Sequence, residues 1–112
     1  MANETLAILN SVDEVIASMP ERFHPENCQK LEAIFQWKLG NPDRAFHIHV
    51  NKGTFEIIDG EHANPDVLIQ CDTEVYLKLV NKQMKDVIAV VTGKLRVKGS
   101  ISTAQKLNRI FI

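Results

Sequence analysis

Apolar residues near the start of the chain recur at intervals of three and four, which indicates an amphipathic helix. The members of this stripe are Leu6, Leu9, Val12, Ile16 and Met19. Pro20 is expected to end the helix after Met19, because proline disfavours helical backbone in the residue before it. Pro25 suits the first turn of a short second helix that runs toward Leu31.

From residue 33 the apolar period becomes two, which is typical of strands with one apolar face. The alternating stretches are 33–39, 46–51 and 54–58, and a more uniformly apolar stretch follows at 67–71. That fourth stretch is expected inside the sheet. A two-residue turn at Lys52–Gly53 would place Ile48 opposite Ile57 and would keep the apolar side chains of both strands on one face.

The second half of the chain returns to helical periods. Thr73 is a candidate N-cap for a helix that ends near residue 82, and a second apolar stripe predicts a helix over 84–92. A short alternating strand at 94–98 leads through Gly99 and Ser100 into a last helix over 101–111. We predict one α+β domain over residues 1–112. It has two layers, with one face of a five-stranded, mostly antiparallel sheet covered by about five helices and an apolar pocket between the layers. The other sheet face is expected to be solvated.

The composition agrees with a globular protein, since 45% of the 112 residues are hydrophobic and 24% are charged. The N-terminal segment lacks the basic start and unbroken apolar run of a signal peptide. Cys28 and Cys71 show no paired spacing, so we expect reduced thiols and a cytoplasmic location. Neither cysteine has a local activating motif, and no glycine-rich phosphate loop is present. Catalytic residues and cofactors are therefore not expected.

Two histidines, His47 and His49, stand two positions apart and alternate with apolar residues in the 46–51 strand. The predicted register places His49 opposite Glu56, so a zinc site of two histidines and a carboxylate is conceivable. A solvated sheet face offers neither a cavity nor a fourth ligand, and a cross-strand histidine–glutamate pair explains the same residues. We expect both histidines to face solvent without a tightly bound metal. A metal-dependent enzyme is the least supported alternative.

The C-terminal stretch VVTGKLRVKGSISTAQKLNRIF (90–111) resembles the hallmark of the sterol carrier protein type 2 family. In that family a helix ends in Gly-Lys-Leu, a short strand ends in glycine and the closing helix carries a Lys-Leu pair. The stretches NPDVLIQCDTEVYLKLV (64–80) and FHIHVNKGTFEI (46–57) are similar to its capped helix and central hairpin. One departure is that Lys82 lacks the glycine and proline that commonly accompany it between the two central helices.

The resemblance implies a non-catalytic protein that binds and transfers lipids in a hydrophobic tunnel between sheet and helices. Fatty-acyl, sterol-like and isoprenoid- or quinone-like amphiphiles are the implied ligands. The expected lining residues are Phe35, Trp37, Ile48, Ile57, Leu79, Val87, Ile88, Val91, Leu107 and Phe111. The strand pattern contains no buried charge that would hold a head group. The alternative is an accessory subunit that presents a lipophilic precursor to partner enzymes.

Charge is divided unevenly along the chain. Residues 1–71 hold 5 basic and 11 acidic residues, a net of −6, and residues 72–112 hold 8 basic and 3 acidic residues, a net of +5. Five cations of the second half are candidates for transient contact with an anionic membrane, and they are Lys94, Arg96, Lys98, Lys106 and Arg109. A plain solvated surface would explain the same residues. Aromatic residues are few, at 6%, and no nucleic-acid partner is expected.

Overall fold

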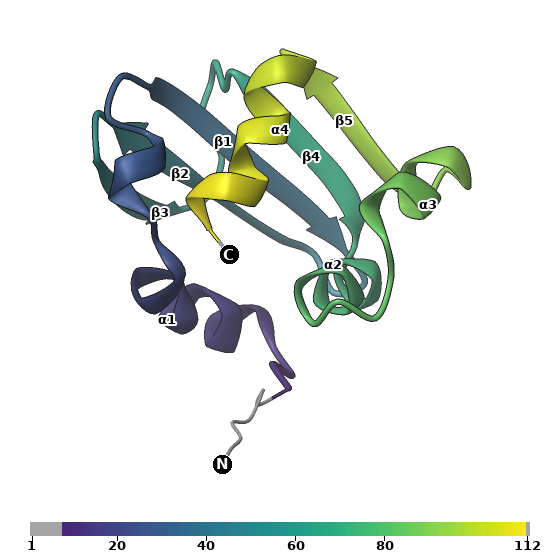
Figure 1. Cartoon of the computed structure of the whole chain (residues 1–112). Helices are drawn as coiled ribbons and strands as arrows, with labels where there is room; N and C mark the ends of the chain where they lie inside the picture. The colour runs from purple at the N-terminus through teal and green to yellow at the C-terminus, as the bar shows by residue number, and fades with distance from the viewer. Residues whose placement is uncertain (1–7, 112) are drawn as a thin grey trace.

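A computed structural model describes residues 8–111, and its centre is a five-stranded sheet (Figure 1). The strands are β1 (Glu32–Gly40), β2 (Arg44–Asn51), β3 (Thr54–Asp59), β4 (Val67–Asp72) and β5 (Leu95–Gly99). Their order in the sheet is β3-β2-β1-β4-β5. The central pair β1–β4 is parallel, and the three other pairs are antiparallel. The mostly antiparallel sheet expected from the alternation is confirmed.

The helices gather on one side of this sheet (Figure 1). They are α1 (Val12–Arg22), the 3-10 turn η1 (Pro25–Asn27), α2 (Thr73–Val80), α3 (Asp86–Val91) and α4 (Ile101–Ile110). Helix α4 crosses the sheet in front of its central strands, and α3 lies at the end of the sheet where β5 begins (Figure 1). The structure is therefore the two-layer α+β arrangement that the pattern predicts.

The core lies between the two layers. Alternate residues of β1 and β2 face the helices and are buried, and they are Ala33, Phe35, Trp37, Leu39, Phe46, Ile48 and Val50. Val15 and Met19 of α1 and Ile110 of α4 meet them from the helical layer. The hairpin has the predicted register, with Ile48 opposite Ile57.

Several helix ends differ from the prediction. Helix α1 begins after its N-cap Ser11, whose hydroxyl accepts a hydrogen bond from the Glu14 amide, so Leu9 precedes the helix. Leu6 lies outside the described residues. Pro20 does not end α1, which continues to Arg22, because a proline near the last turn removes only one backbone donor. The second helix is only the 3-10 turn η1.

Helix α2 also begins one residue earlier than predicted. Its N-cap is Asp72, and Thr73 is its first residue. The Thr73 hydroxyl donates to the carbonyl of Pro42 at 3.0 Å, so it tethers the β1–β2 turn. The last helix has its expected cap, since the Ser100 hydroxyl accepts from the Thr103 amide.

The sheet face opposite the helices is not fully solvated, contrary to expectation. Strand β3 is at one edge, so the chain must cross β2 and β1 before it can form β4. The connecting segment covers Gln36 and His47, which are 3% and 6% exposed. The Gly60 carbonyl lies 2.9 Å from Nδ1 of His47, and the His62 amide donates to Oε1 of Gln36 at 2.7 Å. The prediction that His47 faces solvent is therefore wrong.

Candidate functional site

The ten predicted lining residues occupy three different environments. Three of them, Phe35, Trp37 and Ile48, are buried in the sheet side of the core. Four are partly buried and pack against that core, and they are Ile57, Leu79, Leu107 and Phe111. The remaining three, Val87, Ile88 and Val91, belong to α3 and are exposed. The structure thus brings seven of the ten to the interlayer region and places three on the surface.

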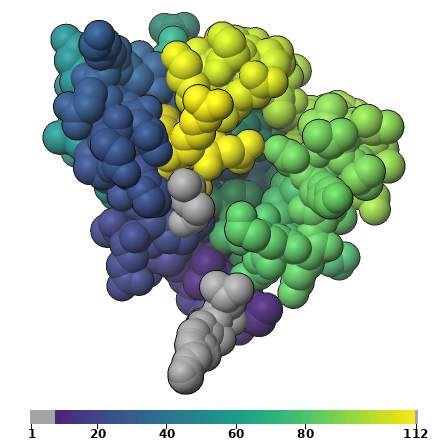
Figure 2. Space-filling view, in the orientation of Figure 1, coloured from purple at the N-terminus to yellow at the C-terminus, as the bar shows by residue number. Residues whose placement is uncertain are grey.

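The partly buried group borders the region between the sheet and the last three helices. Leu79 comes from α2, Leu107 from α4 and Ile57 from β3. In the space-filling view a recess separates the yellow α4 from the green α2 and α3 (Figure 2). Helix α3 packs mainly on β5, and α4 packs on β4, β5 and η1. These helices therefore leave apolar side chains incompletely covered over the sheet.

Aromatic side chains that sequence reasoning did not assign to the site form two clusters beside this region. Phe46 and Tyr76 join Trp37, with centroids 5.2 Å apart for Trp37–Phe46 and 6.3 Å for Phe46–Tyr76. Phe23 and Phe55 surround Phe111, with all three centroid distances between 4.5 and 5.4 Å. Alternation within β2 and β3 could have identified Phe46 and Phe55. The positions of Phe23 and Tyr76 depend on how the helices pack.

One cation, Arg22, was also missed. It follows Val12, Val15 and Met19 on the stripe of α1 that faces the core, and it is half-buried. Its Nε donates to the Ser18 hydroxyl at 3.1 Å, and no carboxylate among residues 8–111 forms an ion pair with it. Burial lowers the pKa of Arg22, and the neighbouring Tyr76 opposes that shift. The apolar stripe of α1, if extended past Met19, would have included Arg22. We did not extend it because Pro20 was expected to end the helix.

Tyr76 lies close enough to Arg22 for the two groups to interact electrostatically. It is 5% exposed, and no hydrogen bond of its hydroxyl occurs within residues 8–111. Burial raises the pKa of Tyr76, and the Arg22 charge lowers it. A buried phenol beside a half-buried guanidinium can donate hydrogen bonds to an anionic oxygen.

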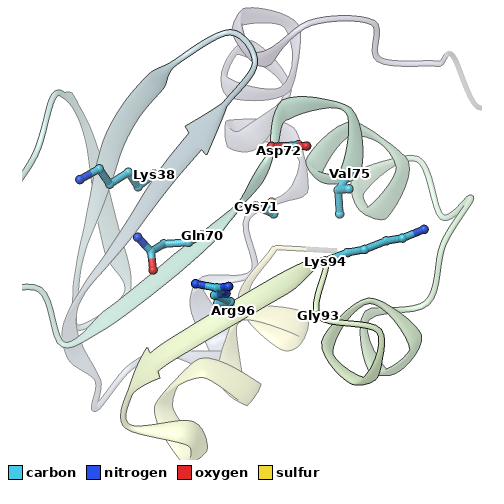
Figure 3. A pocket seen from close by; sticks show the side chains of 8 residues that line it. All are labelled: Lys38, Gln70, Cys71, Asp72, Val75, Gly93, Lys94 and Arg96. Atoms are coloured by element: carbon cyan, nitrogen blue, oxygen red, sulfur yellow. The ribbon is translucent and has the colours of Figure 1, made fainter.

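Two surface hollows lie outside the interlayer region. The first, of about 460 Å³, is lined by Lys38, Gln70, Cys71, Asp72, Val75, Gly93, Lys94 and Arg96 (Figure 3). The second, of about 390 Å³, is lined by residues of the η1 segment together with Lys106 and Arg109. None of the ten predicted lining residues borders either hollow. The five predicted membrane-contact cations are therefore divided: Lys94 and Arg96 line the first hollow, Lys98 lies on β5, and Lys106 and Arg109 line the second hollow.

The Cys71 thiol is a poor nucleophile. Burial, aided by the charge of Asp72, raises the pKa of the Cys71 thiol to about 11. Cys28 is buried, and its thiol lies 3.6 Å from the Pro25 carbonyl oxygen. At neutral pH the Cys71 thiol is protonated, and a thiol rather than a thiolate is a weak nucleophile.

The zinc site that was considered as an alternative does not assemble within the described residues. His49 lies opposite Glu56 in the register, but its Nε2 is 3.4 Å from the Glu32 carboxylate. His47 turns to Gly60 and packs edge-on against His62 at 5.3 Å. Within the described part of the chain no group of three or more histidine, cysteine, aspartate or glutamate residues is arranged to hold a metal. No helix in residues 8–111 has the length and hydropathy required to span a bilayer.

The curated relatives match most of this chain, but the match covers only part of each relative. Hydroxysteroid dehydrogenase-like protein 2 of Rattus norvegicus is 24% identical over 102 residues, which are 89% of this chain and 20% of the relative. The chain thus spans about a fifth of that relative's length. The dehydrogenase name describes the whole relative, of which four-fifths has no counterpart here.

Solved structures share the fold. The solution structure of palmitated SCP2L2 from Aedes aegypti superimposes with a TM-score of 0.71 at 22% identity, covering 90% of this chain and 94% of that one. The inverting sec-alkylsulfatase Pisa1 from Pseudomonas sp. contains a similar domain, with a TM-score of 0.78 at 9% identity. The match covers 88% of this chain and 16% of the sulfatase. The fold therefore occurs both nearly alone and as a small part of longer proteins.

The family itself is shown by a sequence match over nearly the whole chain. The model described as the SCP-2 sterol transfer family matches residues 12–112. This range includes the sheet, the helices and both aromatic clusters. Membership supports the binding or transfer of lipids in general. The chain belongs to the SCP-2 sterol transfer family.

Proposed function

We propose that this protein binds one amphiphilic lipid, with the apolar chain between the covered face of the sheet and helices α2 to α4. The observation that carries this proposal is the incomplete cover of the apolar side chains that face the sheet. Leu79, Leu107 and Phe111 are only partly buried although they pack against the core. An acyl chain in the recess between α4 and the other two helices would complete their burial (Figure 2).

The energy available to such a ligand is moderate. Burying ten methylenes at about 0.8 kcal/mol each gives roughly 8 kcal/mol before the costs of association. The expected dissociation constant is therefore about micromolar or weaker. An affinity in this range allows a lipid to be released as well as held.

The charged group beside the region favours one of the expected ligand classes. Arg22 is half-buried on the core-facing stripe of α1, and Tyr76 is buried next to it. A fatty-acid carboxylate would give Arg22 the ion pair that it lacks within residues 8–111. Sterol-like and isoprenoid- or quinone-like ligands would use the apolar region without this contact. We therefore propose a fatty-acyl chain with a free carboxylate as the preferred ligand.

A head-group comparison tests this preference. Palmitate and methyl palmitate are titrated, below their aggregation concentrations, into the wild type, Arg22→Gln and the control Lys30→Gln. Arg22→Gln should weaken palmitate binding by roughly tenfold, because a hydrogen bond to a charged group contributes about 1.5–3 kcal/mol. Methyl palmitate binding should be equal in all three proteins. Equal palmitate affinity in the wild type and Arg22→Gln would contradict the assigned carboxylate contact.

The position of the acyl chain is tested by filling the region. Leu107→Trp adds volume to the partly buried side of α4, and Ile101→Trp adds the same group at an exposed site on that helix. We expect Leu107→Trp to lose binding of both ligands and Ile101→Trp to retain it. Circular dichroism establishes that both variants are folded. A folded Leu107→Trp variant that binds as well as the wild type would exclude this position.

An accessory role is the second candidate. It is favoured by the longer relatives, in which the matching part is a fifth of the rat protein and 16% of the sulfatase. In that role the domain would present a lipophilic precursor to partner enzymes. Lipid analysis of the protein purified from its host, together with affinity capture, separates the two. A bound lipid without a stoichiometric partner supports the carrier, and a stoichiometric enzyme supports the accessory role.

Contact with anionic membranes also forms part of the proposal. Lys94 directly precedes β5, and Arg96 and Lys98 lie on it; all three are exposed and would attract lipid phosphates. Lys106 and Arg109 border the hollow that also contains Glu26, and they would need a different orientation of the protein. We therefore propose that Lys94, Arg96 and Lys98, rather than all five cations, contribute to one membrane contact.

A further inference from the structure

Helix α3 carries its apolar side chains on the outside of the protein. Val87, Ile88, Val90 and Val91 are 65%, 53%, 50% and 77% exposed, whereas Ala89 is fully buried. With 3.6 residues per turn, the four exposed residues form one continuous arc opposite Ala89. An ordinary surface helix has the reverse arrangement, with its apolar stripe toward the core.

This helix also projects from the body of the protein. It lies beyond the end of the sheet where β5 begins, and its atoms form a lobe in the space-filling view (Figures 1 and 2). The Lys94 amide donates to the Ala89 carbonyl at 2.9 Å, which ties the helix to the start of β5. The exposed apolar residues therefore lie on a projecting helix whose C-terminal end is hydrogen-bonded to the start of β5.

The chain segment that contains α3 is rich in cations. Residues 81–100 contain five basic residues and one acidic residue, a net charge of +4. The basic residues are Lys82, Lys85, Lys94, Arg96 and Lys98, all exposed and none in an ion pair within the described chain. The acid, Asp86, accepts a hydrogen bond from the Val87 amide at 2.8 Å. The segment thus combines exposed aliphatic groups with unpaired positive charge.

We infer that α3 is a membrane-insertion element, which enters an anionic bilayer with Val87, Ile88, Val90 and Val91 while the cations of segment 81–100 contact lipid phosphates. Aliphatic side chains gain by leaving water for the acyl boundary, and each neighbouring cation adds attraction to an anionic surface. This inference deepens the membrane contact under the proposed function, because it names the inserted residues and adds Lys82 and Lys85.

The positive charge of residues 81–100 argues against a second copy of the chain as the partner that covers the apolar arc of α3. A two-fold interface places the same patch on both sides, so it would bring two segments of charge +4 together. Like charges brought together at an interface repel one another. A bilayer with anionic head groups can bury the apolar arc among its acyl chains and attract the cations of residues 81–100 to its head groups.

Vesicle co-sedimentation tests the inference with three proteins. Wild type, Val87→Ser/Val91→Ser and the control Ile58→Ser are mixed with phosphatidylcholine vesicles that contain or lack phosphatidylglycerol. Ile58 is an exposed aliphatic residue on β3, distant from α3 in the strand order. The wild type and the control should bind the anionic vesicles equally, and the double variant should bind more than about tenfold more weakly. Equal binding by all three proteins overturns the inference.

The cations are tested in the same assay. Lys82→Gln/Lys85→Gln should weaken binding to anionic vesicles by roughly fivefold per lysine, since each cation near such a surface contributes about 1 kcal/mol. The matched control Lys30→Gln/Lys106→Gln alters two exposed lysines beside the second hollow and should bind as the wild type does. A loss confined to the control pair would place the contact on the other side of the protein and overturn the inference.

Insertion is distinguished from surface contact by fluorescence. Val91→Trp places an indole at the most exposed apolar position of α3, while Trp37 is 7% exposed and gives a constant background. Anionic vesicles should shift the emission of this variant to shorter wavelength and leave the wild type unchanged. No shift despite binding would overturn insertion. A wild-type dimer that Val87→Ser/Val91→Ser dissociates would instead identify a self-interface and also overturn it.

The test of the insertion element can fail independently of the test of the proposed lipid site. Palmitate is titrated into the same variants without vesicles. Palmitate binding by a wild type that does not bind vesicles overturns the insertion element alone. Vesicle binding that depends on α3 in a protein that binds no palmitate supports the insertion element and contradicts the proposed lipid site.

Discussion

The nearly parallel rings of Trp37 and Phe46 stack across β1 and β2, with centroids 5.2 Å apart and an interplanar angle of 7°. The two residues are direct partners in the strand register, and both are buried. Phe46 and Tyr76 form an edge-type pair with centroids 6.3 Å apart. At this separation the two rings leave no room for a ligand between them, so the proposed acyl chain would lie beside the stack, toward Ile57, Leu107 and Phe111.

Phe46→Leu should lower the free energy of unfolding by about 1–2 kcal/mol. The reason is the loss of a ring pair that contributes about 0.5–1.5 kcal/mol beyond its buried area, together with imperfect filling of the space. Urea unfolding followed by circular dichroism measures the change. Trp37 emission in the folded variant reports whether its surroundings loosen. A variant as stable as the wild type would show that the stack contributes little.

The two histidines of β2 should behave differently when they are replaced. His47→Ala should cost about 1–2 kcal/mol, since it removes the hydrogen bond with the Gly60 carbonyl and leaves a buried space. His49→Ala should change stability by less than about 0.5 kcal/mol, as expected for a surface site. The comparison uses denaturant unfolding at one pH for both variants. Equal costs would mean that the segment after β3 does not cover His47 in solution.

Gly99 should be far less replaceable than Gly60. Both have positive φ, at 102° and 98°, but a Cβ at Gly99 would collide with the carbonyl of Asp66, and a Cβ at Gly60 meets no atom. Gly60→Ala should cost about 1 kcal/mol from backbone strain alone, and Gly99→Ala several times more. Thermal unfolding of the two variants gives the comparison. Similar melting temperatures would contradict the close approach of β5 to β4 at this point.

Stability should fall at alkaline pH. Burial raises the pKa of Cys71 from 9.0 to about 11, and it raises the pKa of Tyr76. The unfolded chain therefore releases the Cys71 proton at a pH where the folded protein retains it. The free energy of unfolding should decrease as pH rises from about 9 to about 11, because the folded state binds more protons in that window.

Variants assign this pH dependence to its source. Cys71→Ala and Tyr76→Phe each remove one proton that the folded state retains, so each should flatten the decline. Below pH 8 neither group titrates, and the slope there should match the wild type. Unfolding free energies measured at several pH values provide the test. An unchanged slope in both variants would exclude these two groups as the cause.

Local periodicity determined the elements and the register of the hairpin. The alternation in β2 and β3 excluded a shift of one residue, which would reverse every side chain, and the two-residue turn at Lys52–Gly53 then fixed Ile48 opposite Ile57. Ser100 capped the last helix as expected, since a cap depends only on residues within one turn. The family resemblance rested on the same local features, and the match over residues 12–112 confirms it.

Only the tertiary structure decided whether a side chain outside the hairpin and the helix caps is buried or exposed. His47 is buried because the chain crosses β2 and β1 on the way from β3 to β4, and alternation within a strand carries no information about that crossing. Arg22 reaches the core-facing stripe because α1 continues past Pro20, which local propensity alone predicted as its end. The same apolar spacing predicted burial for Val87, Ile88 and Val91, yet they are exposed. A helical stripe specifies which residues share a face, but only the packing of the whole chain determines whether that face meets the sheet or the solvent.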